Sequence, residues 1–286
     1  MNAPFDAETF KAAIRDQWDK HAKGWNDHGA QIGEWLREST AAMLSMAEVG
    51  TGGHVLDVAA GSGDQTLEIA RRVGPTGSVL ATDLSPAILE FAQTNARLAG
   101  YDNVRTQVAD GENLCLGEAG FDAAICRLGL MFFLDPGKGL EEMFRALKPG
   151  GRACTMVFSA PDQNPCVSIL LSTALRHAGL PPRDPYQPGG LLSLGKPGLT
   201  DALFRQAGFS QVASTKMMAP FKLPSVDHYI DFIRTSASPI LQILARLDDA
   251  ARDAAWADIK ARLSVFDTSR GWEGPNELLL TIGRRP

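Results

Sequence analysis

The sequence predicts an α/β fold, in which a doubly wound, mostly parallel sheet of seven strands is covered by helices and capped by further helices. Strand-like apolar runs and helical runs alternate from residue 53 onwards, a pattern typical of a parallel sheet. The first strand-like run ends in a glycine-containing loop, "AAGSGD", that leads into a helical pattern. A length of 286 residues with 44% hydrophobic residues suffices for one large domain or for a core with a cap.

The alternating part of the chain supplies the seven expected strands in order. The first is "HVLDVAA", where Val55, Leu56 and Val58 favour a strand, and a helix follows it to about Val73. The other expected strands are residues 78–83, 104–110, 121–130, 151–159, 211–221 and 277–285, with helices at 85–100 and 137–148. Ligands of such sheets bind beyond the carboxyl ends of the strands, so we expect chemistry in the loops there.

Three segments interrupt the alternation and are expected to form a mostly helical cap over that edge of the sheet. These are residues 1–48, the Pro- and Gly-rich residues 160–196, and residues 224–268. The core is then residues 49–159 and 197–286, with the last two cap segments as insertions. Apolar side chains of the cap segments are expected to supply its walls: Trp35, Met43, Tyr229, Phe232 and Ile233.

The loop "VLDVAAGSGD" indicates a nucleoside ligand more than a dinucleotide. Gly61 and Gly63 allow a ligand to approach the backbone at a helix start. A dinucleotide fingerprint requires a third glycine three residues after Gly63, but Thr66 stands there. A nucleoside without a diphosphate remains compatible with this loop.

Two acidic residues at strand ends support a nucleoside. Asp83 ends the second expected strand twenty residues after Gly63, where a carboxylate can accept hydrogen bonds from both ribose hydroxyls. Asp110 ends the third expected strand, where it and Gly111 can hold the exocyclic amine of adenine. Each acid alone is equally compatible with a helix N-cap or a solvated strand end. Their occurrence together with Asp57 in the first strand favours ligand binding.

In these residues the sequence resembles the class I S-adenosylmethionine-dependent methyltransferases, in particular the ubiquinone and menaquinone biosynthesis C-methyltransferases. The matching stretches, in order, are "VLDVAAGSGD", "VLATDLSP", "VADGENL", "FDAAICRLGLMFF" and "RALKPGGR", within residues 55–152. The stretch "QAGF" at 206–209 extends the match. The resemblance implies a Rossmann-like methyltransferase fold and S-adenosyl-L-methionine as the cofactor.

The resemblance also implies roles for individual residues. Asp83 would bind the ribose, and Leu84 would lie against the adenine. Arg127 departs from the small polar residue usual there, and its other interpretation is a structural salt bridge or carbonyl clamp. Trp18 and Trp25 in "QWDKHAKGW" replace two tyrosines of a helix that covers the cofactor, or they simply pack that helix. The full set of implied cofactor-binding residues is Trp18, Trp25, Asp57, Ala59, Gly61, Ser62, Gly63, Asp83, Leu84, Asp110, Gly111, Cys126 and Arg127.

For the acceptor, the resemblance suggests a small hydroxylated aromatic or polyketide-like molecule, of the kind met in secondary metabolism, methylated at carbon or oxygen. Methylation at oxygen gains from a general base, for which the candidates in the cap segments are His28 and His228. Methylation at the carbon of a phenolate or enolate can proceed by positioning alone. The five histidines form no HxxxH or HExxH pattern, so no metal is expected.

Two other functions remain open, a nicotinamide-dependent oxidoreductase and a cofactor-binding subunit without catalysis. The missing third glycine disfavours the oxidoreductase, as does the lack of a lysine four residues after any tyrosine. The net charge of −5 gives no basic surface for nucleic acid. No export pattern or membrane-length apolar run is visible, so we expect a soluble, cytoplasmic protein, with a homodimer possible, that acts on a small molecule.

Overall fold

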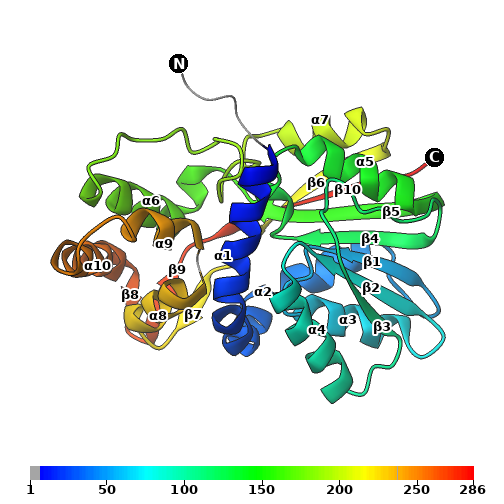
Figure 1. Cartoon of the computed structure of the whole chain (residues 1–286), viewed down its shortest axis with the longest axis horizontal. Coiled ribbons are helices and arrows are strands. Elements are labelled where there is room, and N and C mark those ends of the chain that lie inside the picture. The colour runs from blue at the N-terminus through cyan, green and yellow to red at the C-terminus, as the bar shows by residue number, and fades with distance from the viewer. Residues whose placement is uncertain (1–6, 237) are drawn as a thin grey trace.

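A seven-stranded sheet forms the centre of the computed structural model, which describes residues 7–236 and 238–286 (Figure 1). The strand order is β3-β2-β1-β4-β5-β10-β6. Strands β1 to β5 pair in parallel, whereas β10 runs antiparallel between β5 and β6. The strands are β1 (His54–Val58), β2 (Ser78–Asp83), β3 (Val104–Val108), β4 (Phe121–Arg127), β5 (Leu147–Phe158), β6 (Ser210–Met218) and β10 (Glu277–Arg284). The predicted fold class is confirmed.

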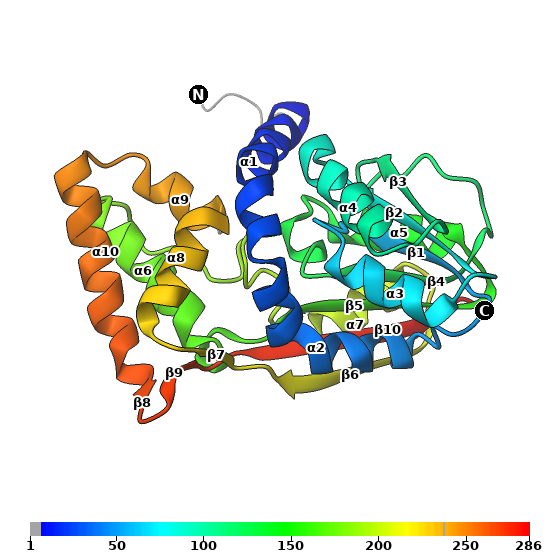
Figure 2. The ribbon, with the colours of Figure 1, turned by 90° about the horizontal axis from the view of Figure 1, so that it is seen from below.

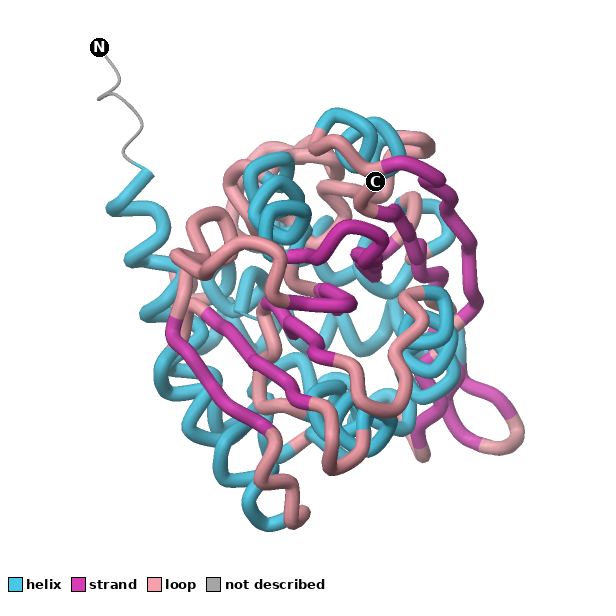
Figure 3. The backbone as a smooth tube through the Cα atoms, turned by 90° about the vertical axis from the view of Figure 1, so that its right-hand side faces the viewer, coloured by secondary structure: helices cyan, strands magenta, loops and turns pink. Residues whose placement is uncertain are grey.

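Helices cover both faces of this sheet. Helices α2 (Gly29–Met46), α3 (Asp64–Val73) and α4 (Pro86–Leu98) lie on one face, and α5 (Pro136–Ala146) and α7 (Leu199–Gln206) lie on the other (Figure 1). Figure 3 shows the strands in magenta with helices in cyan around them. Strand residues that face the helices are Val55, Leu56, Ala124, Ile125 and Leu280, all at most 1% exposed, so the hydrophobic core lies on both sides of the sheet.

Local sequence explains where the helices beyond β2 and β4 begin. Ser85 accepts a hydrogen bond from the Ile88 amide at 3.2 Å, and Pro86 occupies the first helical turn of α4. Asp135 caps α5 in the same way, at 3.2 Å from the Lys138 amide. A side-chain oxygen before the helix and a proline at its start both favour initiation there. The chain therefore turns sharply at the carboxyl edge of the sheet.

The helical cap lies beyond the carboxyl ends of the strands, beside the sheet (Figure 2). It contains α6 (Pro165–His177), α8 (Val226–Ser236), α9 (Ser238–Leu244) and α10 (Asp249–Leu263). A small sheet joins it to the core through β7 (Phe221–Leu223), β8 (Asp267–Thr268) and β9 (Gly271–Gly274). Short 3-10 helices are η1 (Leu130–Phe132), η2 (Pro161–Gln163) and η3 (Ser264–Phe266).

Helix α1 (Ala7–Asp27) runs between the cap and the sheet, as the dark blue helix in the middle of Figure 1 shows. It contacts α4 on the side of the sheet and α8 and α9 on the side of the cap. Asp19 of α1 accepts a hydrogen bond from the hydroxyl of Ser85, the residue that caps α4. The first helix of the chain therefore closes the space between the two parts.

The structure differs from the expected cap in one respect. Residues 1–48 do not all belong to the cap, because α2 packs against α3, β5 and β10 as part of the layer on the sheet. Within residues 160–196, α6 supplies thirteen helical residues, in line with a helical cap. Residues 1–6 and 237 of the cap segments lie outside the described residues. No helix of the described ranges combines the length and apolarity needed to cross a membrane.

Candidate functional site

The loop after β1 is held from beneath by Asp57. Its carboxylate is fully buried and accepts hydrogen bonds from Thr66 Oγ1 at 2.6 Å and from Gln65 Nε2 at 3.2 Å. Burial raises the pKa of Asp57 to about 7, although both hydrogen bonds and Arg127 oppose the shift. Asp57 therefore connects the strand to the first turn of α3 and fixes the loop between them.

We expect Asp57→Asn to remove a pH dependence of stability. A carboxyl whose pKa rises from 3.8 to about 7 on folding binds more protons in the folded state, so stability falls as pH rises between these values. Asparagine keeps both partners, because its oxygen accepts from Gln65 and its amide donates to Thr66. The melting temperature of the variant relative to that of the wild type should therefore rise as the pH increases from about 4 to 7. A constant difference across that range would contradict the buried, neutral carboxyl.

Close packing explains the glycines of this loop. Gly63 has a φ of 89°, and a Cβ added there would lie 3.0 Å from the backbone of Ala92 in α4. Neither condition suits another residue. The loop can therefore pass directly beneath α4, and the backbone of Gly61 reaches the carboxylate of Asp83.

Asp83 is the last residue of β2 and lies at the carboxyl edge of the sheet, as the sequence predicts. One carboxylate oxygen accepts the Gly61 amide at 3.0 Å, and the other accepts the Ser85 amide at 3.0 Å. Burial raises the pKa of Asp83, while these amides oppose the rise. Leu84 follows at the cavity wall. The two amides orient the carboxylate beside the glycine loop.

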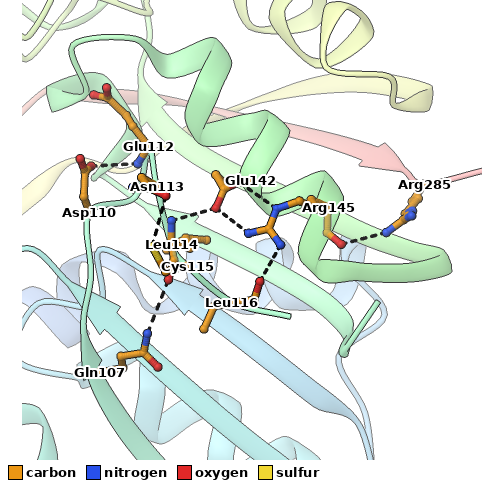
Figure 4. A network of polar contacts seen from close by, with 10 residues as sticks. All are labelled: Gln107, Asp110, Glu112, Asn113, Leu114, Cys115, Leu116, Glu142, Arg145 and Arg285. Carbon is orange, nitrogen blue, oxygen red and sulfur yellow. Dashed lines mark hydrogen bonds and ion pairs between the residues drawn. The ribbon is translucent and has the colours of Figure 1, made fainter. Parts of the chain in front are cut away.

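The loop after β3 carries Asp110, Gly111 and Glu112 and is tied to α5. Figure 4 shows Glu142 of α5 accepting the Leu114 amide, at 2.8 Å, while it also pairs with Arg145. A Cβ added at Gly111 would lie 2.2 Å from the ring of Phe133, so only glycine fits there. These contacts hold Asp110 near the end of β3.

Lys11 of α1 bridges two carboxylates of this loop. Its Nζ lies 2.6 Å from Asp110 and 2.9 Å from Glu112. Glu112 also accepts the Leu134 amide at 2.7 Å, which ties the loop to the segment after η1. Sequence reasoning did not identify Lys11 or Glu112. The charge of Lys11 among acidic residues of another segment becomes apparent only when α1 is placed over the sheet.

Arg127, at the end of β4, forms a structural salt bridge, which is one of the two roles that the sequence left open. Its guanidinium binds both carboxylate oxygens of Asp64 at 2.6 and 2.5 Å and donates to Thr40 at 3.0 Å. It is 6% exposed and still borders the cavity. The arginine thereby joins β4 to α2 and to the first turn of α3, directly beneath the glycine loop.

These elements surround a first cavity at the carboxyl edge of the sheet. Of the residues that sequence analysis implied, the following line it: Trp18, Trp25, Ala59, Gly61, Asp83, Leu84, Asp110, Gly111 and Arg127. The others do not: Asp57, Ser62, Gly63 and Cys126. Asp57 and Cys126 are fully buried in their strands. Asp57 supports the loop from below through Gln65 and Thr66.

The two candidate bases lie away from this cavity. His28 contacts the hydroxyl of Thr235 at 2.9 Å and Gln31 at 3.2 Å, and His228 contacts Ser225 at 2.9 Å. Neither lines the first or the second cavity. Membership of a cap segment did not reveal that His28 lies in the turn between α1 and α2, nor which face of α8 His228 occupies.

Aromatic side chains form one wall of the first cavity, which we call the aromatic wall. It consists of Trp35, Phe158, Phe221, Tyr229 and Phe232. Trp35, Tyr229 and Phe232 were expected as walls of the cap, whereas Met43 and Ile233 are buried elsewhere. Phe158 and Phe221 were missed because each ends or begins a strand. Phe232 lies 6.1 Å from the ring of Trp25, so the wall continues to the glycine loop.

A second, larger cavity adjoins the first. Its volume is about 880 Å³, against about 170 Å³ for the first. Phe10, Ile14 and Trp18, one turn apart on α1, line both cavities. The second cavity also lies against α6, α9 and residues 180–192. Helix α1 is thus the partition between the two spaces.

Comparison with known proteins supports this fold, and the matched residues include the strands β1 to β5 and the loops between them. Residues 32–171 match the model of the ubiE/COQ5 methyltransferase family. The chain is 38% identical over 127 residues to the ubiquinone/menaquinone biosynthesis C-methyltransferase UbiE of Pasteurella multocida, covering 44% of this chain and 47% of that protein. The UbiE protein of Hahella chejuensis is 38% identical over 126 residues, with 44% and 50% covered. The chain thus matches about half the length of these curated relatives.

Solved structures show the same fold at lower identity. The YcgJ protein of Bacillus subtilis has a TM-score of 0.59 at 23% identity, with 87% of this chain and 98% of that chain covered. A structure described as a putative methyltransferase, from Bacillus halodurans, has a TM-score of 0.58 at 19% identity, with 87% and 99% covered. The resemblance stated from the sequence is confirmed: the chain has the class I methyltransferase fold and resembles UbiE in its central part.

Proposed function

We propose that this chain, whose fold and central segment resemble those of class I methyltransferases, transfers the methyl group of S-adenosylmethionine to a small hydroxylated aromatic or polyketide-like acceptor. One observation carries the proposal. The first cavity has a bare glycine loop and two strand-end carboxylates on one side and an aromatic wall on the other. A nucleoside needs the former surface, and an apolar acceptor needs the latter.

The residues at the edge fit such a cofactor. Asp83 can accept hydrogen bonds from a ribose, and Asp110 can accept from the adenine amine in exchange for Lys11. The two glycines let aromatic rings approach the loops closely: a Cβ added at Gly61 would lie 3.2 Å from Trp25 Nε1, and one added at Gly111 would lie 2.2 Å from the ring of Phe133. The first cavity is smaller than is usual for ligand sites, which span roughly 300 to 1,000 Å³. We therefore propose that side chains of α1, Lys11 among them, move when the cofactor binds.

Position and exclusion of water account for catalysis in this arrangement. The bound sulfonium supplies an activated methyl group, so the chain must align the acceptor and keep the reacting atoms dry. In the described residues no histidine lines either cavity, which favours positioning over a histidine base. Together with the C-methyltransferase relatives, this supports methylation at a ring carbon activated by a neighbouring hydroxyl.

The deciding experiment uses labelled S-adenosylmethionine with phenols, hydroquinones and small polyketides, followed by analysis of the products. We expect a labelled product in which the methyl group is bonded to carbon. Calorimetric titration with S-adenosylmethionine and with NADH separates this function from the oxidoreductase. Binding of NADH alone would refute the proposal. Binding of S-adenosylmethionine without any transfer would instead favour the non-catalytic subunit.

We propose that the second cavity admits the parts of a bulky acceptor that extend beyond the aromatic wall. Ser172 of α6 lines it and is exposed, so Ser172→Trp should occupy part of it and narrow the space for an acceptor. Turnover of bulky acceptors should fall roughly 10- to 100-fold, because displaced acceptors lose alignment, while the Kd for S-adenosylmethionine stays constant. The matched control is Ser45→Trp, an exposed serine of α2 outside both cavities. Equal turnover by the two variants would show that acceptors bind elsewhere.

A further inference from the structure

We infer that Asn276 orients the acceptor, by accepting a hydrogen bond from a hydroxyl group on an aromatic ring that lies against the aromatic wall. The inference rests on the proposed function and adds the chemistry by which the acceptor is recognised. It follows from an unpaired buried oxygen, from its place in the sheet, and from the rings around it.

Asn276 lies at the carboxyl edge of the sheet. It directly precedes β10, whose first paired residues align Leu278 with Phe158 at the end of β5. The backbone carbonyl of Asn276 accepts the Ala219 amide at 2.8 Å, and the next residue donates its amide to Asn164 at 3.1 Å. The backbone is therefore fixed from two sides, and the residue lies in the lining of the first cavity.

One half of the Asn276 amide has no partner. The residue is 1% exposed, and its Nδ2 donates to the Gly274 carbonyl at 3.3 Å. Its Oδ1 is buried without a hydrogen-bond partner in the described residues. Folded proteins pair the large majority of buried polar atoms, so an orphan acceptor beside a cavity indicates a donor that comes with a ligand. The contact with Gly274 defines which end of the amide is the acceptor.

The rings beside Asn276 define the shape of that ligand. Trp35 donates a hydrogen bond from its Nε1 to the carbonyl of Ala219 at 2.6 Å. The amide of the same Ala219 donates to the backbone carbonyl of Asn276. Phe221 and Phe158 both stack on Trp35. The ring centroids lie 3.9 Å from Trp35 for Phe221 and 6.2 Å for Phe158. Flat aromatic surfaces favour a flat aromatic ligand. Through Phe232 and Trp25 the same surface reaches the glycine loop at Gly61.

Another buried orphan in the core clarifies why Asn276 is distinct. Thr155 Oγ1 of β5 is also unpaired and buried, but Thr155 does not line a cavity. Asn276 borders the first cavity, whereas Thr155 borders neither cavity. Thr155→Val is therefore the matched control for the removal of an orphan oxygen.

The test compares two ligands of similar size, 2-naphthol, which has a hydroxyl donor, and 2-methoxynaphthalene, which has none. Calorimetric titration of the full chain requires no cofactor. Wild type should bind 2-naphthol about 5- to 10-fold more tightly than 2-methoxynaphthalene, because this ratio of Kd values corresponds to the free energy of one neutral hydrogen bond. Asn276→Leu should bind both ligands equally, whereas Thr155→Val should keep the preference. Asn276→Asp should also keep it, since a protonated carboxyl still donates to Gly274 and accepts from the ligand.

Three results would overturn the inference: equal binding of the two ligands by wild type, no binding of either, or a preference that survives in folded Asn276→Leu. Thermal melting shows whether that variant is folded, and the wild-type comparison stands without it. Failure of the proposed function is a separate outcome. In that case 2-naphthol is preferred through Asn276, but no labelled methyl group is transferred to any acceptor.

Discussion

Arg127→Leu is expected to lower the free energy of unfolding by about 3 to 5 kcal/mol, the cost of removing one partner from a buried ion pair. The guanidinium side chain is 3% exposed and the paired carboxylate of Asp64 is 18% exposed. Without the arginine this carboxylate keeps no ion-pair partner among the described residues, and Thr40 loses its donor. Urea unfolding of the two proteins measures the difference.

A solvent-exposed pair provides the control for this variant. Arg71 lies on α3 with its side chain 62% exposed and pairs with Glu68 at 2.6 Å. Arg71→Leu should cost less than about 1 kcal/mol, because exposed ion pairs contribute little. If both variants lose the same stability, Arg127 does not have the buried structural role that its contacts indicate.

Asp83→Ala is expected to weaken binding of S-adenosylmethionine by roughly 10- to 100-fold. A hydrogen bond to a charged group is worth about 1.5 to 3 kcal/mol, and about 1.4 kcal/mol corresponds to a factor of ten. The loss adds to any loosening of the Gly61 amide, which Asp83 now holds at 3.0 Å. Calorimetry or equilibrium dialysis measures the Kd.

Asp122→Ala is the matched control for Asp83→Ala. Asp122 lies near the start of β4, where it accepts the His54 amide at 2.8 Å and pairs with Lys148 at 2.7 Å. It does not line either cavity, so its removal should leave the Kd unchanged. An unchanged Kd for Asp83→Ala would refute the role of the second strand in cofactor binding.

Local patterns predicted where the segments at the carboxyl edge of the sheet lie. The strand, the loop with Gly61 and the following helix are contiguous in sequence, and a strand-end acid such as Asp83 needs only the sheet topology to be placed. The same patterns did not show that Cys126 and Asp57 lie outside the lining of the first cavity, because a motif indicates a segment and not which side of it a side chain occupies. In a strand, neighbouring side chains point to opposite faces.

The acceptor side could not be predicted in this way. Asn276 and Phe221 become neighbours of Trp35 only through the pairing of distant segments. No local pattern encodes an orphan oxygen, since it depends on every neighbour around it. The positions of the two histidines were hidden for a related reason: His28 lies in the turn before α2 and His228 on α8, and the direction of each ring follows from how these helices pack.

The position of β10 between β5 and β6 sets the order in which the site can be completed during synthesis. Chains emerge from the ribosome N-terminal end first, and early segments can begin to fold before later ones exist. Strands β1 to β5 pair only with one another and with β10, so the loops at Gly61, Asp83 and Asp110 can assemble early. Strand β6 has no neighbour in this sheet except β10. Strand β6, and Ala219 just after it, therefore reach their final partners only when β10 and Asn276 have been synthesised, so the side of the site that faces the acceptor is completed after the side with the glycine loop.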